Sequence, residues 1–204
     1  MGFGMFEGCS NLQDFSTCLS NLHEGNSMFT SCINLTKFDA SLENLRGGGR
    51  MFAYCKSLSE FSSNLDKLVE GDYMFCTCIE LPKFDINMPK LEEGSRMFIA
   101  CNKLTTFTSD LSSLTNGESM FMYCDNLTSF SSDLSSLRYG RSMFTRCGLD
   151  AKSLMYIAYS INDVTNLSTY DSDKKIDIGL NYDLYGSAGS TFSKLPDDVR
   201  EYLN

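Results

Sequence analysis

The residues best suited to chemistry in this 204-residue sequence are its nine cysteines, because a thiolate can bind a metal or attack a substrate. Zinc ligands usually recur roughly two to four residues apart. Here a close pair occurs at Cys76 and Cys78 with no second pair to complete it, and seven of the cysteines recur every 23 residues, at Cys9, Cys32, Cys55, Cys78, Cys101, Cys124 and Cys147. This spacing predicts a buried column of reduced, structural thiols, with some disulfide formation as the alternative and no metal or cofactor.

The remaining residue types offer little material for catalysis. His23 is the single histidine, and the sequence contains no G-x-S-x-G, P-loop or H-E-x-x-H motif. The aspartates of residues 171–177 lack the glycine and terminal glutamate of an EF-hand loop. We therefore expect no catalytic residues and a protein that is not an enzyme.

Charge and hydropathy exclude two further classes of partner. Lys and Arg number 17 against 26 Asp and Glu, and the resulting net charge of -9 argues against binding to nucleic acid phosphates. No apolar run approaches the roughly 18 residues that a membrane-spanning helix requires, so we expect no membrane insertion.

An internal repeat of 23 residues organises the first three quarters of the chain. The unit reads G-x-x-M-F-x-x-C-x-x-L-x-x-F-x-x-x-L-x-x-L-x-x, and its Met-Phe pair recurs without insertion from Met5-Phe6 to Met143-Phe144. Thirteen of the 15 Phe residues occupy two columns, a column being the set of residues at one position of successive units. The unusual Phe and Met content therefore indicates a repetitive core.

Three short elements are expected in each unit. Met, Phe and Cys lie at the helical spacing i, i+3, i+4 and i+7 from the Gly, which predicts a short helix between Gly and Cys. The following L-x-x-F segment favours a short strand. The Gly that closes the return segment is expected to adopt a positive φ.

The segments MFTSCINLTKF, MFIACNKLTTF and MFMYCDNLTSF resemble the BspA-type leucine-rich repeats of bacterial surface proteins, of gut bacteria and of their phages. The resemblance covers residues 2–149 and implies a right-handed solenoid that serves adhesion or protein recognition without enzymatic activity. We thus expect an α/β fold of seven 23-residue coils over residues 1–149, followed by a C-terminal α+β capping subdomain over residues 150–204.

The expected cap contains three elements. An amphipathic helix should follow Asp150, its N-cap, with Leu154, Ile157, Ala158, Ile161 and Val164 on one face. A strand is expected over residues 174–180, and a last short helix over residues 195–204.

Two polar columns flank the Phe of the expected strand and form the candidate partner-binding face. If both columns point outward, charges alternate between neighbouring units in the first half of the array, and Ser and Thr dominate the second half. The alternative to a recognition face is a solvated surface whose opposite charges pair between strands. A glycan-binding Ser/Thr face is a weaker alternative. The residues are Asp14, Ser16, Lys37, Asp39, Glu60, Ser62, Lys83, Asp85, Thr106, Thr108, Ser129 and Ser131.

These observations favour a non-enzymatic protein-recognition or adhesion module. A phage-borne protein, either a virion component or an acidic inhibitor of a host protein, and a purely structural spacer are the alternatives. A competing binding surface would use Tyr54, Ile99 and Tyr123 on the opposite side of the units. Reduced cysteines and the lack of a signal peptide in this sequence favour the cytosol or an anaerobic niche, whereas a fragment of a longer secreted protein would lie at the cell surface.

Overall fold

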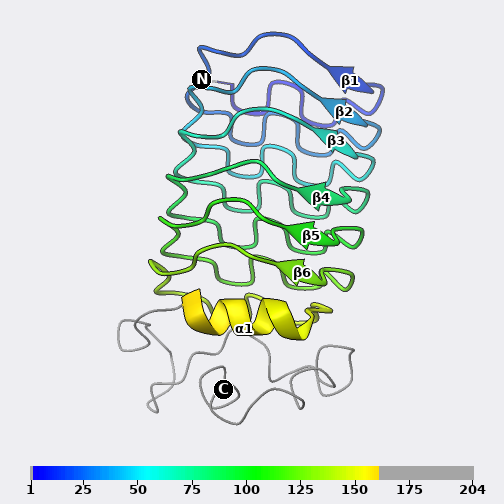
Figure 1. The fold of residues 1–204 in the computed structure, drawn as a ribbon. Helices are drawn as coiled ribbons and strands as arrows, with labels where there is room; N and C mark the ends of the chain where they lie inside the picture. Colours follow the sequence, from blue (N-terminus) through cyan, green and yellow to red (C-terminus); the bar gives the residue numbers. More distant parts are fainter. Residues whose placement is uncertain (1, 161–204) are drawn as a thin grey trace.

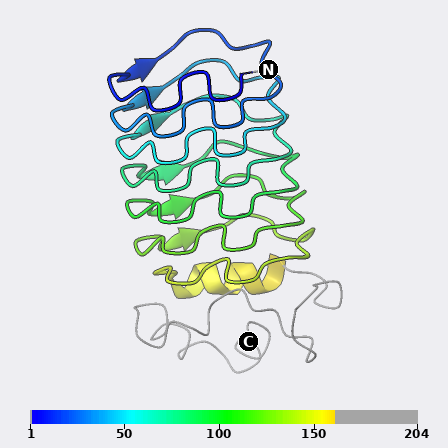
Figure 2. The ribbon, with the colours of Figure 1, turned by 180° about the vertical axis from the view of Figure 1, so that it is seen from behind.

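The computed structural model describes residues 2–160, in which successive repeats wind into coils stacked one on another (Figures 1 and 2). Each of six short strands starts one residue before a Phe of the second Phe column, as the sequence predicts. The strands lie on one side of the stack, and a helix follows the last strand. The elements are β1 Asp14–Phe15, β2 Lys37–Phe38, β3 Glu60–Phe61, β4 Lys83–Phe84, β5 Thr106–Phe107, β6 Ser129–Phe130 and α1 Ala151–Ser160.

The strands pair in parallel and keep the 23-residue register. β1, β2 and β3 form one three-stranded sheet, and β4, β5 and β6 form a second. Immediately before β3 the N–H of Ser59 donates to the carbonyl of Thr36 over 3.0 Å. Pro82 occupies the position of Ser59 in the next unit, and proline has no N–H to donate. The sheet is therefore interrupted between β3 and β4.

The segment between Gly and Cys is a series of tight turns, so the predicted helix is wrong. Within one unit the N–H of Thr30 donates to the carbonyl of Ser27 over 3.1 Å, whereas the N–H of Phe29 donates 2.9 Å across to Met51 of the next coil. Ser27 and Ser31 have φ values of 58° and 61°, in the left-handed region. Half of the backbone N–H groups of this Gly-to-Cys segment thus bond to the next coil. The turns direct the periodic Met, Phe and Cys side chains into the core.

The glycines that open each repeat have a steric role. The prediction that they adopt a positive φ is wrong. Described glycines with positive φ are Gly4 and Gly8, which lie outside this column. A Cβ added to Gly48 would lie 3.0 Å from Sδ of Met74 and 3.3 Å from Cδ1 of Leu68. Each such glycine therefore makes room for the methionine of the next unit.

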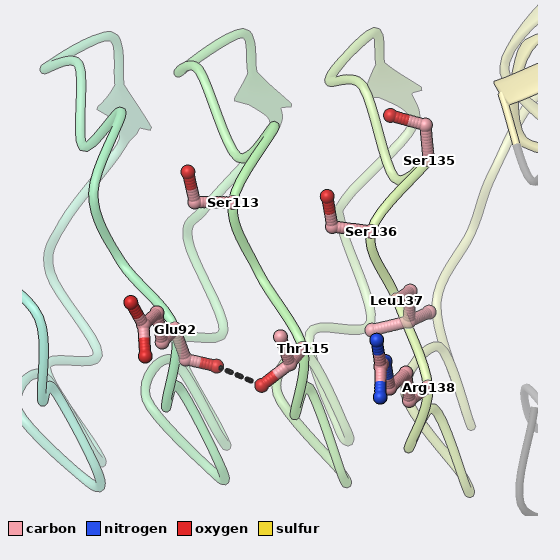
Figure 3. Close-up of a pocket in the computed structure, with 7 residues that line it drawn as sticks. All are labelled: Glu92, Ser113, Thr115, Ser135, Ser136, Leu137 and Arg138. Carbon is pink, nitrogen blue, oxygen red and sulfur yellow. Dashed lines mark hydrogen bonds between the residues drawn. The ribbon is translucent and has the colours of Figure 1, made fainter.

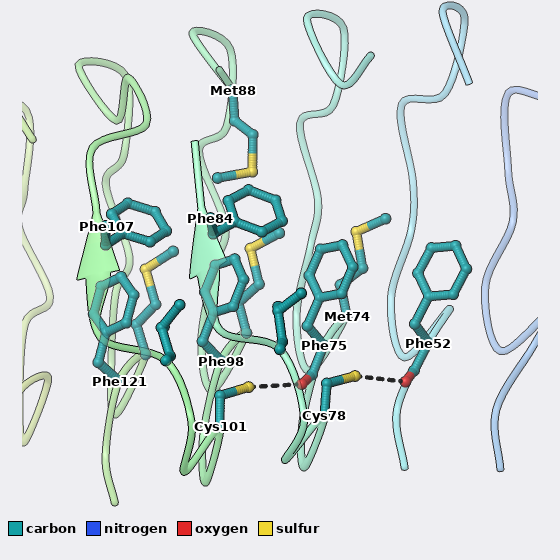
Figure 4. Packing of buried hydrophobic residues seen from close by; sticks show 14 of the residues in the cluster. Phe52, Met74, Phe75, Cys78, Phe84, Met88, Phe98, Cys101, Phe107 and Phe121 are labelled. Atoms are coloured by element: carbon teal, nitrogen blue, oxygen red, sulfur yellow. Dashed lines mark hydrogen bonds between the residues drawn. The ribbon is translucent and has the colours of Figure 1, made fainter. Parts of the chain in front are cut away.

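Two columns of phenylalanine rings form the centre of the core (Figure 4). Phe75 stacks on Phe98 of the next coil with ring centroids 5.3 Å apart, and it meets Phe84 edge-on at 5.2 Å. Both geometries are favourable for aromatic pairs and recur along the stack. Because every ring contacts rings of adjacent coils, burial in one coil depends on its neighbours.

The cysteine column is buried, as expected, except in the first coil. Each buried thiol of the column donates to a Phe carbonyl 26 residues earlier; the bond from Cys78 to Phe52 measures 3.2 Å. Burial raises the pKa of the Cys124 thiol to about 12 and that of Cys101 well above its ordinary value, so both thiols stay protonated at neutral pH. All nine cysteines are free thiols, with Cys9 and Cys18 exposed.

Helix α1 covers the last strand, and Asp150 caps it as predicted. Oδ1 of Asp150 accepts the N–H of Ser153 over 2.8 Å, and Leu154 and Ile157 are buried against the core. The Ser153 hydroxyl accepts the N–H of Phe130 over 2.9 Å and so takes the place of a further strand beside β6. The rest of the expected cap, including Ile161, Val164, the strand and the last helix, lies outside the described residues.

Candidate functional site

The candidate partner-binding face follows the six strands and is here called the strand face. Its members are the twelve residues predicted from sequence, at the first position of each strand and two positions later. Eleven of these are exposed and Ser129 is half-buried. Because alternate residues of a strand point to one side, the intervening Phe side chains enter the core while both polar columns face outward.

Strand pairing places the first polar column in a continuous row within each sheet. Asp14 is paired with Lys37, and Lys37 with Glu60, so charge alternates from one strand to the next. In the second sheet Lys83 is paired with Thr106, and Thr106 with Ser129. The strand face thus has a charged half and a predominantly hydroxylated half, and the interruption at Pro82 separates them.

The lysines of the strand face form ion pairs within their own repeats. Nζ of Lys37 lies 3.4 Å from Oδ2 of Asp39, and Nζ of Lys83 lies 3.1 Å from Oδ2 of Asp85. The face therefore pairs with itself at these lysines, as the alternative interpretation expects, but each lysine pairs with the aspartate of its own repeat instead of an acid on a neighbouring strand. A long lysine side chain can reach position i+2 on its own strand, although that position is roughly 6.6 Å away and the neighbouring strand only roughly 4.8 Å away. Exposed pairs of this kind contribute at most about 1 kcal/mol and stay available to a partner.

The competing surface predicted on the turn segments is less continuous. Tyr54 and Tyr123 are 47% and 40% exposed, whereas Ile99 is half-buried. The guanidinium of Arg146 lies over the Tyr123 ring at 5.5 Å and covers part of it. Two separated tyrosines therefore replace the apolar patch expected there.

A shallow polar groove that sequence reasoning missed crosses the return segments of the later coils (Figure 3). Its lining combines hydroxyl groups with one acidic and one basic side chain: Glu92, Ser113, Thr115, Ser135, Ser136, Leu137 and Arg138. The hydroxyl of Thr115 donates to the backbone carbonyl of Glu92 over 3.0 Å, and Ser136 donates likewise to Ser112 over 2.6 Å. The repeat offered one signal for this groove, because three of its lining residues occupy the same column at 23-residue intervals: Glu92, Thr115 and Arg138.

Residues 2–160 contain neither a metal-binding cluster nor a membrane-spanning helix. In this part of the chain no three His, Cys, Asp or Glu side chains are grouped closely enough to hold a metal ion. The helix described there is also too short to cross a bilayer.

Comparison with known proteins assigns the family. The model for BspA-type leucine-rich repeat regions matches residues 1–87 and 48–170 and finds six copies. The chain belongs to the BspA-type leucine-rich repeat family. Leucine-rich repeat domains generally mediate protein binding and are typically non-enzymatic. The resemblance drawn from the MFxxC segments is thereby confirmed.

Two solved structures are similar to this BspA-type chain. A leucine-rich repeat protein of T. pallidum shares 17% identity, with a TM-score of 0.42 over 77% of this chain and 80% of that one. A leucine-rich repeat protein of Bacteroides ovatus shares 16% identity, with a TM-score of 0.40 over 62% of this chain and 45% of that one. No curated protein sequence matches.

Proposed function

We propose that this chain is a non-enzymatic protein-recognition module that binds its partner through the strand face. The observation that carries the proposal is the in-register row of exposed charged residues Asp14, Lys37 and Glu60 on paired strands. Such a row presents alternating charge at the strand spacing of roughly 4.8 Å, which suits a partner with complementary charges at the same spacing.

Short side chains of the strand face support the same conclusion. Ser16, Ser62, Thr106 and Thr108 are exposed and small, so a partner can approach the backbone of the strands closely. Ordering such residues on binding costs less conformational entropy than ordering long flexible side chains. The turn segments offer less continuous area, because Tyr54 and Tyr123 are exposed but separated and Arg146 covers part of the Tyr123 ring.

The same proposal includes the finer architecture. We infer a right-handed solenoid of seven 23-residue units over residues 1–149, with residues 150–204 as its capping subdomain. The burial of Leu154 and Ile157 of α1 supports the cap, because the end of a repeat stack needs an element with one apolar and one polar side. Adhesion is the biological setting that we propose, supported by the family resemblance.

Quantitative affinity capture tests this function with three baits. Wild-type protein is compared with a strand-face variant, Lys37→Glu, Glu60→Lys and Lys83→Glu, and with Lys56→Glu, which makes the same net charge change at an exposed turn position. The proposal predicts a protein that is retained by wild type and Lys56→Glu and lost by the strand-face variant. Loss with Lys56→Glu alone would place the interface on the turn side. Absence of any specifically retained protein would favour a structural spacer.

A further inference from the structure

The polar groove of Figure 3 crosses the return segments of three successive units and has a volume of about 550 Å³. Sites for small molecules typically have volumes of roughly 300–1,000 Å³. Lys67 and Lys90 occupy one column in two earlier units, and Ser113 and Ser136 continue that column in the next two. This change from long to short side chains opens the groove. None of the residues that line it belongs to the strand face.

The hydroxyl groups in the floor of the groove have already donated their single protons to the protein. Ser113, Thr115 and Ser136 donate to backbone carbonyls of the preceding units over 2.7, 3.0 and 2.6 Å, respectively. Their remaining lone pairs can accept hydrogen bonds from a ligand. The floor therefore favours a ligand that is rich in hydrogen-bond donors.

A carboxylate and a guanidinium group stand at the two ends of this floor (Figure 3). The N–H of Thr115 donates to the carbonyl of Glu92 over 3.0 Å, and the N–H of Arg138 donates to that of Thr115 over 2.9 Å. The backbones of Glu92 and Arg138 are thus two strand spacings apart, roughly 10 Å. Opposite charges on adjacent coils can pair, as Arg96 and Glu118 do over 2.9 Å. Glu92 and Arg138 are exposed, and in the described part of the chain neither side chain forms an ion pair or a hydrogen bond.

This arrangement of donors and acceptors selects among ligand classes. A phosphate or sulfate group offers acceptors to a floor that also accepts, and the charge of Glu92 repels it. An ammonium ion suits the floor and Glu92, but the charge of Arg138 repels it. A neutral sugar carries hydroxyl groups that donate to the floor and to the carboxylate and accept from the guanidinium. It also has no charge to remove from water.

The length of the groove indicates the form of the sugar. Glu92, Thr115 and Arg138 repeat at the strand spacing of roughly 4.8 Å. An extended β-1,4-linked glycan advances by nearly the same length with each pyranose ring, whereas an α-1,4-linked glycan coils. We propose that the groove binds a neutral, extended β-1,4-linked oligosaccharide that runs along the stack with one pyranose ring on each coil. The inference is independent of the partner proposed for the strand face.

Titration of the full chain with cellotetraose, followed by NMR of the backbone amides, tests the proposal. Saturable shifts should centre on Thr115 and Arg138. Thr115→Val keeps the shape of the side chain and removes one acceptor, so it should weaken binding by about threefold to tenfold. The combined variant Ser113→Lys and Ser136→Lys restores the residue type of the two earlier units and fills the groove. It should weaken binding at least about tenfold, with an unchanged unfolding midpoint.

A matched control and two comparison ligands make the result decisive. Ser10→Lys combined with Ser59→Lys makes the same charge change at exposed positions outside the groove and should bind like wild type. Maltotetraose, which is α-1,4-linked, and inorganic phosphate should cause much smaller shifts at Thr115 and Arg138. The proposal would be overturned by an absence of saturable shifts, by shifts centred on the strand face, by equal shifts with either comparison ligand, or by undiminished binding to the groove-filling variant.

Discussion

The thiol of Cys78 donates a 3.2 Å hydrogen bond to the carbonyl oxygen of Phe52, which belongs to the preceding coil. The same carbonyl accepts the N–H of Cys55 over 3.1 Å. The side chains of Cys78 and Phe52 are both fully buried. Cys78 thus fills core volume and also satisfies the backbone of a neighbouring coil. A purely apolar residue of similar size would fill the core volume but would not bond to that backbone carbonyl.

Replacing this buried thiol should lower stability. Cys78→Ala is expected to reduce the free energy of unfolding by about 1–2 kcal/mol, because it removes packed volume and a hydrogen bond. Cys9→Ala, at the exposed thiol of the same column, is the matched control and should change stability by less than about 0.5 kcal/mol. Urea unfolding measures both, and equal losses would show that the bond between coils is unimportant.

Thiol reactivity should separate the cysteines into two groups. Cys9 and Cys18 are exposed and should be alkylated rapidly in the native protein, whereas the other seven are buried and should react only on unfolding. Hydrogen bonding to Ser20 lowers the pKa of the Cys18 thiol, which increases its thiolate fraction at neutral pH. Site-resolved mass spectrometry after brief labelling provides the measurement. Rapid labelling of Cys78 or Cys101 in the folded protein would contradict the buried column.

Stability should fall at alkaline pH because the buried thiols keep their protons. Burial raises the pKa of Cys124 to about 12, whereas an unfolded cysteine titrates near about 8.5. Above that lower value the unfolded state loses a proton that the folded state retains, so the contribution present at neutral pH is lost as pH rises toward 12. Each such thiol contributes a slope of about 1.4 kcal/mol per pH unit.

A cysteine variant isolates this effect from the titration of Tyr and Lys. Cys124→Ala should be less stable than wild type at pH 7. Between pH 9 and pH 10, however, its free energy of unfolding should fall by about 1.4 kcal/mol less than that of wild type. Urea unfolding at the three pH values gives the comparison. Identical pH slopes for the two proteins would mean that Cys124 ionises freely in the folded state.

Position along the stack should determine the cost of removing a phenylalanine. Phe84 lies between Phe61 and Phe107, with ring centroids 6.0 and 5.9 Å away, and Phe84→Ala is expected to cost roughly 3–5 kcal/mol. Phe15 is half-buried in the first coil and stacks on Phe38 at 5.6 Å, so Phe15→Ala should cost clearly less. Thermal or urea unfolding of both variants is the check, and equal losses would be inconsistent with coils that depend on both neighbours.

Much of the fold could be predicted because the 23-residue period places every buried column. The strand at Phe38, the buried Cys column and the Asp150 cap all follow from residue type and spacing. The turn segment could not be predicted in the same way, because Ser27 and Ser31 adopt the left-handed conformation without being glycine. The i, i+3, i+4 and i+7 spacing of Met, Phe and Cys also arises when successive tight turns direct these side chains to one side. This spacing therefore does not distinguish such turns from a helix.

The exposure of the candidate site was predictable, but its interactions were not. Alternation along a strand is sufficient to place Lys37 and Asp39 on the surface. Whether Lys37 pairs with Asp39 or with a neighbouring strand depends on the rotamer of a flexible side chain, which spacing does not determine. The sheet interruption had a visible signal, since Pro82 stands where the preceding unit has a hydrogen-bond donor.

The strand face is the central claim, and the dissociation constant of the captured partner tests it most directly. Calorimetric titration should compare wild type, the combined variant Lys37→Glu, Glu60→Lys and Lys83→Glu, and the double variant Tyr54→Ala and Tyr123→Ala. The strand-face variant should bind more than about fivefold more weakly, corresponding to about 1 kcal/mol, with an unchanged unfolding midpoint, because its charges are exposed. The tyrosine variant should bind like wild type. Normal binding by the strand-face variant, together with loss of binding by the tyrosine variant, would contradict the account and assign the interface to the turn side.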